Sequence, residues 1–133
     1  MIGAIIITHG KLAEALVSTA EAIAGRLENV RHISIDVCDS AKCIGDSISN
    51  AIKTMDKNDG IIILTDMFGG TPSNIGLSFL EPGKVEILTG VNLPMLLKFA
   101  GHRTDKNFLE LAALLKEYGQ KSIVLASEVL KGK

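Results

Sequence analysis

The sequence predicts an α/β fold in which a doubly wound, mainly parallel sheet carries helices on both faces. Strand-like apolar runs alternate along the chain with segments of helical periodicity, which is the pattern of parallel strands joined by crossover helices. Two of these runs, residues 2–8 and 60–64, are apolar almost throughout, as expected of strands that are buried on both faces. With a strand order of about 2-1-3-4, these two strands would be neighbours in the middle of the sheet.

The composition fits one globular domain over residues 1–133. Hydrophobic residues make up 47% of the chain, and the formal charge is −1 with 14 basic residues that are spread along the sequence. This charge distribution argues against nucleic acid or a lipid surface as the main partner. No apolar run reaches the ~18–20 residues that span a bilayer, and the first four residues lack the basic region of a signal peptide. We therefore expect a cytoplasmic protein in which Cys38 and Cys43 are reduced thiols.

The first half of the chain contains three strands and two helices in alternation. Residues 2–8 form the first strand, and a helix that ends near Gly25 follows. The apolar residues of this helix recur at helical spacing and would face the core: Leu12, Leu16, Ala20 and Ile23. Residues 30–37 alternate polar and apolar side chains, which indicates a strand nearer a sheet edge. Asp39 or Ser40 then caps the second helix, and the third strand follows a polar turn.

The second half continues the alternation. A short helix is expected over residues 72–80, and residues 85–89 form the fourth strand. Asn92 caps the next helix, and a further helix begins at Thr104 or Asp105. A fifth strand is expected at residues 123–126, where four apolar residues follow one another.

The third strand leads into a segment that predicts an anion-binding site. The strand stops at Asp66, because a carboxylate at greater depth would be unpaired. Gly69 and Gly70 allow the backbone to turn and to approach a ligand closely. Thr71 is a good N-cap, and Pro72 suits the first helical turn. A carboxylate beside a glycine turn and a helix N-terminus would bind an anion such as a phosphoryl group.

The predicted topology brings His9 to the same place. In an open parallel sheet, ligands bind beyond the carboxyl ends of the strands where the strand order reverses, here between strands that end in His9 and Asp66. If Asp66 accepts the hydrogen of His9 Nδ1, then Nε2 faces the opening as a nucleophile. A phosphoryl group there would meet the backbone N–H groups from Gly69 to Ser73 and the hydroxyl of Thr71.

Other interpretations of these residues remain open. A lone histidine at a strand end is often structural, and an aspartate before a turn often caps only the backbone. A metal site lacks a third ligand, since Asn92 is the only polar candidate nearby, and we expect no metal or cofactor. A serine hydrolase is disfavoured, because no histidine is placed to activate Ser73. A regulator that binds a small molecule or nucleotide, or an interaction module with a vestigial site, would use the same pocket without chemistry.

Three segments together resemble a known family. They are Ile-Ile-Ile-Thr-His-Gly at residues 5–10, Asp-Met-Phe-Gly-Gly-Thr-Pro-Ser-Asn at residues 66–74, and Gly-Val-Asn-Leu-Pro-Met at residues 90–95. In this order and spacing, the sequence is similar to the IIA component of the mannose family of the bacterial phosphoenolpyruvate-dependent sugar phosphotransferase system. The similarity covers essentially the whole chain.

The resemblance implies a phosphoryl carrier. His9 matches the histidine that accepts a phosphoryl group from phospho-HPr and passes it to a IIB component. Asp66 matches the acid that holds this histidine, and Thr71 matches a hydroxyl residue against the phosphoryl group. Met67 and Phe68, apolar residues on a loop that is otherwise expected to be exposed, are candidates for contacts with the partner proteins, and the alternative that both fold inward stays open. The link to the membrane components IIC and IID would be indirect, and the final acceptor, a sugar or dihydroxyacetone, stays open.

The resemblance also implies a homodimer. In this family the last strand is antiparallel and is exchanged between the two subunits, and residues 123–126 would be that strand. Because the chain stops at Lys133, its IIB component is expected to be a separate protein.

Overall fold

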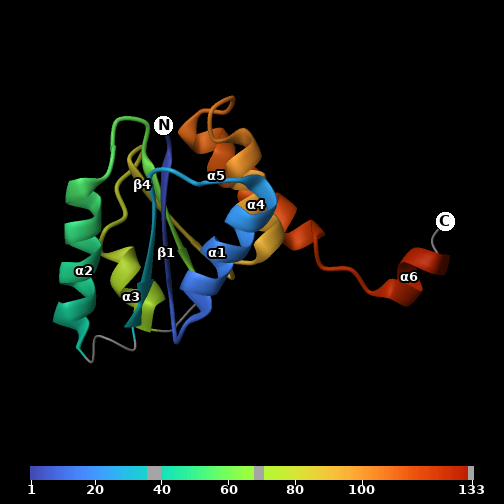
Figure 1. Cartoon of the computed structure of the whole chain (residues 1–133), viewed down its shortest axis with the longest axis horizontal. Helices are drawn as coiled ribbons and strands as arrows, with labels where there is room; N and C mark the ends of the chain where they lie inside the picture. Colours follow the sequence, from blue (N-terminus) through green and yellow to red (C-terminus); the bar gives the residue numbers. More distant parts are fainter. Residues whose placement is uncertain (36–39, 68–70, 132–133) are drawn as a thin grey trace.

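A computed structural model of the chain describes residues 1–35, 40–67 and 71–131, without the side chains of residues 71–73. Strands and helices alternate through β4, after which the chain is helical (Figure 1). In order, the elements are β1 (Gly3–Thr8), α1 (Leu12–Ala24), β2 (Val30–Ser34), α2 (Ala41–Thr54), β3 (Ile61–Thr65), α3 (Thr71–Leu77), β4 (Val85–Thr89), α4 (Leu93–His102), α5 (Phe108–Lys121) and α6 (Ala126–Lys131).

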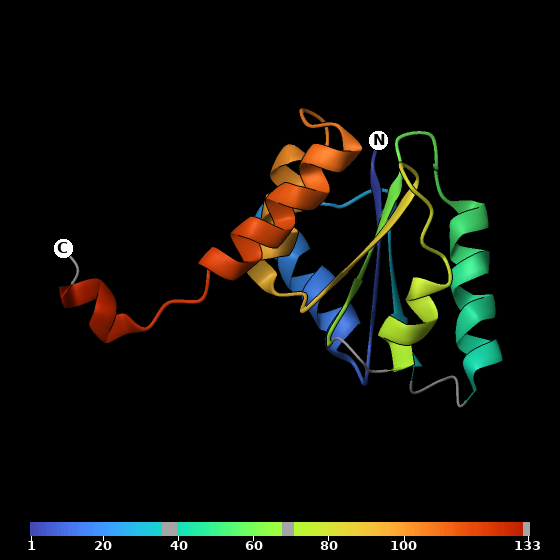
Figure 2. The same ribbon diagram turned by 180° about the vertical axis from the view of Figure 1, so that it is seen from behind.

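The strands form one sheet in the order β2-β1-β3-β4, and every neighbouring pair is parallel. Helices α2 and α3 cover one face of the sheet, and α1, α4 and α5 cover the other (Figures 1 and 2). The predicted fold class and strand order are therefore confirmed for these four strands. The register pairs Ile7 with Thr65, so β1 and β3 end side by side.

Two apolar cores lie on opposite faces of the sheet, because successive side chains of a strand point to opposite faces. Ile6 and Leu64 belong to the core under α1, α4 and α5, whereas Ile5 and Ile63 belong to the core under α2 and α3. Every residue of β1 and β3 is buried, while β2 and β4 are only half-buried. The central and edge strands are thus those that the apolar runs predicted.

Helix starts follow the local capping chemistry. Ser40 accepts a hydrogen bond from the backbone N–H of Cys43 at 3.1 Å and begins α2. Asn92 accepts from the N–H of Met95 at 2.9 Å and begins α4. The predicted start of the next helix at Thr104 or Asp105 is wrong, because Asn107 forms a capping box with Glu110 and the helix begins after it.

The core face of α1 also differs from the prediction. Ala20 is buried as predicted and Leu16 packs half-buried against the core, but Ala13 and Val17 are buried in place of Leu12 and Ile23, which are 45% and 61% exposed. Shorter side chains face the sheet where the helix lies close to it. Leu12 is consequently left at the surface beside the end of β1.

The predicted strand at residues 123–126 is not formed in the single chain. After α5, residues 123–125 have no regular structure, and α6 lies away from the body of the molecule (Figures 1 and 2). Ile123, Val124 and Leu125 are 80%, 61% and 62% exposed. A strand requires a hydrogen-bonding neighbour, and in the described part of this chain none lies alongside these residues.

Two further expectations concern cysteines and membranes. Cys43 is disulfide-bonded, so the expectation of a reduced thiol there is wrong, and Cys38 lies outside the described residues. The expectation rested on sequence spacing and cellular compartment, neither of which tests whether a disulfide is geometrically possible. Among the described residues, no helix has the length and hydropathy needed to cross a bilayer.

Candidate active site

The loop that carries His9 is fixed by the last residue of β1. Thr8 is fully buried, and its hydroxyl donates to the carbonyl of His9 at 3.0 Å. The same hydroxyl accepts from the backbone N–H of Ala13 in the first turn of α1 at 2.7 Å. Gly10 has a φ of 57°, in the left-handed region that favours glycine. The chain therefore turns sharply at His9 before α1 begins.

Asp66 accepts two hydrogen bonds from His9 with a single carboxylate oxygen. Its Oδ2 lies 2.9 Å from Nδ1 of the imidazole and 3.0 Å from the backbone nitrogen of His9. The side chain of His9 is 49% exposed, whereas that of Asp66 is 13% exposed. A largely buried acid thus holds an accessible imidazole, as the topology predicted.

This contact determines the tautomer of a neutral ring. An ionised carboxylate only accepts hydrogen bonds, so Nδ1 of His9 must carry the proton that it shares with Asp66. In the neutral ring Nε2 then keeps its lone pair, and no hydrogen bond to Nε2 comes from the residues that the structure describes. The arrangement matches a nucleophilic imidazole oriented by a carboxylate.

The environment of Asp66 favours its ionised form. Burial alone would raise the pKa of this carboxyl group, but hydrogen bonds from the His9 backbone and ring, together with the charge of the ring, outweigh burial and hold the pKa below its usual value. Its other oxygen, Oδ1, is buried and has no hydrogen-bond donor among the described residues. The acid is therefore held by His9 through Oδ2 alone.

The rest of the predicted phosphoryl site is described only in part. Gly69 and Gly70 lie outside the described residues. Thr71 and Ser73 lie in the first turn of α3, and only their backbone is described. The phosphoryl-binding roles of these four residues stay predictions.

Two exposed apolar side chains lie close in sequence to His9 and Asp66. Met67 follows Asp66 directly and is 54% exposed, and Leu12 at the start of α1 is 45% exposed. Phe68, the other predicted contact residue, lies outside the described residues. The exposure of Leu12 was not predicted, since the periodicity placed this residue in the core.

The other predicted candidates lie elsewhere. Asn92 caps α4 and also donates to the carbonyl of Gly119 at 3.3 Å, so its amide is occupied. His32 is exposed on β2, and His102 Nδ1 lies 3.2 Å from Asp105. Within residues 1–35, 40–67 and 71–131, no group of three His, Cys, Asp or Glu side chains could hold a metal ion.

Comparison with known proteins finds the same kind of protein by family model, by sequence and by structure. The family model described as "PTS system fructose IIA component" matches residues 3–116. The PTS system fructose-specific EIIA component of Bacillus subtilis (strain 168) is 30% identical over 132 residues, which cover 98% of this chain and 90% of that protein. The crystal structure of phosphotransferase system component EIIA from Streptococcus agalactiae superposes with a TM-score of 0.85 at 28% identity, covering 96% of this chain and 98% of that chain.

A longer relative contains the same region. The PTS system mannose-specific EIIAB component of Escherichia coli (strain K12) is 33% identical over 124 residues, 92% of this chain. These residues make up 38% of the bacterial protein, so the chain spans about two fifths of the length of this relative.

Proposed function

This chain belongs to the family of PTS system fructose IIA components, which are phosphoryl carriers of the sugar phosphotransferase system, and from this membership we propose that it carries the phosphoryl group on His9. The donor is phospho-HPr and the acceptor is a IIB component. Residues 1–133 act as one IIA domain in the cytoplasm, and the membrane components IIC and IID are reached only through IIB.

One observation supports this proposal most strongly, namely the hydrogen bond of 2.9 Å between Nδ1 of His9 and Oδ2 of Asp66. The lone pair of Nε2 attacks the phosphorus atom, and the bond between phosphorus and the donor nitrogen breaks with its electron pair left on the donor imidazole. Asp66 stabilises the positive charge that the attacking ring of His9 develops, and it keeps Nε2 directed outward. Transfer to IIB is the same substitution, with Nε2 as the leaving group.

Transfer between two proteins requires that the partner proteins exclude water from the phosphoryl group. Met67, which follows Asp66, and Leu12, three residues after His9, provide exposed apolar surface, of the kind found in the centre of protein interfaces. We assign them to the surface on which HPr and IIB dock in turn. The backbone N–H groups of Gly69, Gly70 and Ser73 and the hydroxyl of Thr71 are the proposed ligands of the phosphoryl oxygens.

The proposal is tested by incubation with labelled phosphoenolpyruvate, the general phosphotransferase enzyme and HPr. We expect one label per chain that is acid-labile and base-stable, as phosphohistidine is. His9→Ala should remove the label completely, whereas His32→Ala, which changes an exposed histidine on β2, should leave it unchanged. A label that survives His9→Ala, or no label on the unaltered chain, would overturn the assignment.

A further inference from the structure

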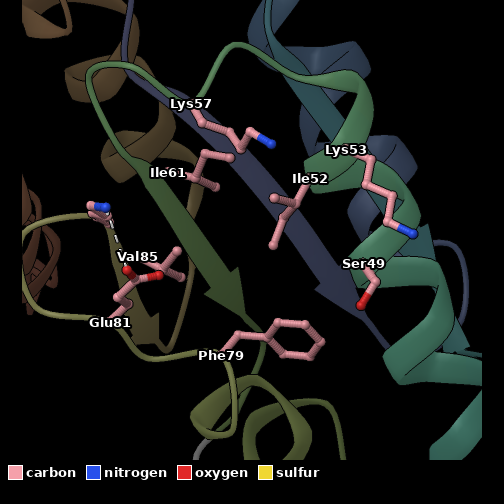
Figure 3. Close-up of a pocket in the computed structure, with 9 residues that line it drawn as sticks. Ser49, Ile52, Lys53, Lys57, Ile61, Phe79, Glu81 and Val85 are labelled. Carbon is pink, nitrogen blue, oxygen red and sulfur yellow. Dashed lines mark ion pairs between the residues drawn. The ribbon is translucent and has the colours of Figure 1, made fainter.

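A hollow lies at the end of the sheet opposite His9. It has a volume of about 320 Å³ and is bounded by α2, the amino-terminal ends of β3 and β4, and the connections that lead into these strands (Figure 3). Ile61 and Val85, the first residues of β3 and β4, form its floor. His9 and Asp66 follow the carboxyl ends of β1 and β3, so a ligand in this hollow would not block them.

The walls of the hollow are apolar. Ile52 on α2 and Phe79 after α3 lie over the same face of the sheet and are only half-buried, so part of each remains available for contact (Figure 3). Ser49 adds one hydroxyl on α2. Both the volume and the mainly apolar walls resemble those of sites for small organic molecules.

The rim of the hollow is cationic. Lys53, Lys57 and Lys84 line it, and Glu81 is the one acidic residue beside them. Lys84 lies 3.7 Å from Glu81, so that carboxylate is already paired. Neither Lys53 nor Lys57 has an ion pair with any residue in the described ranges.

The position of these lysines favours an anion at one edge of the hollow. Lys53 lies in the last turn of α2, where a cation offsets the partial negative charge of the helix end. Lys57 extends from the connection between α2 and β3 towards Ile52, over the apolar part (Figure 3). A ligand with an apolar body and a single carboxylate would contact the walls and place its charge near Lys57.

From this combination we propose that the hollow binds a small amphipathic organic anion, a carboxylate on a short apolar body. The charge favours an anion over neutral or cationic ligands of the same shape, because Lys53 and Lys57 are exposed cations at the rim. The site is independent of phosphoryl transfer at His9, so each proposal can fail without the other.

The test uses octanoate as the probe, with octanol as its uncharged counterpart and acetate as the anion without an apolar body. Binding is followed through amide chemical shifts of the isotope-labelled chain. We expect octanoate to bind and to shift the amides of Ile52, Ile61, Phe79 and Val85, and we expect both counterparts to bind at least about five-fold more weakly.

Variants locate the charge that the anion meets. Lys57→Gln should weaken octanoate binding by about two- to five-fold, the range for one exposed charge pair, and Lys57→Glu should weaken it further. Lys42→Gln removes the same charge from the other end of α2 and should change nothing. Equal binding of octanol, shifts centred on other elements, equal effects of the Lys42 and Lys57 variants, or no octanoate binding would each overturn the proposal.

Discussion

One oxygen of Asp66 orients His9, the proposed phosphoryl carrier, because it accepts hydrogen bonds from both the backbone and the ring of His9. The backbone contact fixes the position of the residue, and the ring contact fixes which nitrogen carries the proton. In the proposed transfer, the acid therefore acts both by position and by charge. The two contributions can be separated, because an amide keeps an acceptor oxygen but carries no charge.

Asp66→Asn should slow phosphoryl transfer to His9 without preventing it. A hydrogen bond to a charged group contributes about 1.5–3 kcal/mol, which corresponds to a fall in rate on the order of 10- to 100-fold when that charge is lost in the transition state. Rapid-quench measurement of label transfer from phospho-HPr checks this. A rate within about two-fold of the unaltered chain would show that the charge of Asp66 has no part in the transfer.

Asp66 should also make the stability depend on acid pH. The pKa of its carboxyl group is lowered in the folded chain, so the stabilisation is complete above the unfolded pKa of about 3.9 and is lost as the pH falls through the folded value. Urea unfolding from pH 7 to pH 3 should give a shallower loss of stability for Asp66→Asn than for the unaltered chain. The pKa of Asp56 is also lowered, so part of the pH dependence of stability remains in both the variant and the unaltered chain. The same loss of stability between pH 7 and pH 3 in Asp66→Asn and in the unaltered chain would contradict this prediction.

Among the elements, the junction between β1 and α1 depends on Thr8. Thr8→Val keeps the shape of the side chain but removes the acceptor for Ala13 and the donor for His9. Leaving a buried N–H group unpaired costs about 1–3 kcal/mol, and we expect that loss in the free energy of unfolding measured with urea.

Thr65→Val is the matched control for Thr8→Val. Thr65 is equally buried at the end of the neighbouring strand, but its hydroxyl has no hydrogen-bond partner among the described residues. Thr65→Val should therefore lower the free energy of unfolding by less than about 1 kcal/mol. Equal losses for the two variants would mean that the hydroxyl of Thr8 does not hold the junction.

The sequence predicted the central elements better than the peripheral ones. The long apolar runs at residues 2–8 and 60–64 favour strands that are buried on both faces, and neighbouring parallel strands end at one edge of the sheet, so the meeting of His9 and Asp66 followed from topology. The two hydrogen bonds of the Thr8 hydroxyl were not predicted, because a threonine at the end of an apolar run has the pattern of any strand residue. The start of α5 was misplaced, since Thr104, Asp105 and Asn107 are all acceptable caps and only the contact with Glu110 decides between them.

For the whole molecule, the C-terminal segment could not be predicted from the single chain. An apolar run predicts that some surface buries it, but not that the surface belongs to the same chain. The segment exposes five large apolar side chains to 60–86%: Ile123, Val124, Leu125, Val129 and Leu130. A second copy of the chain is the partner that the family resemblance implies, with residues 123–126 as the exchanged strand.

We therefore expect the full chain to sediment as a dimer and a chain truncated after Ser122 to sediment as a monomer with its sheet intact. Burial of one large apolar side chain stabilises by about 1.5–3 kcal/mol, so the loss of only two such contacts would raise the dimer dissociation constant more than about 100-fold. Ile123→Asp with Leu125→Asp tests the same contacts without shortening the chain. A dimer that survives both changes must be held by another surface, whereas a full chain that is monomeric would leave the C-terminal segment without a partner copy.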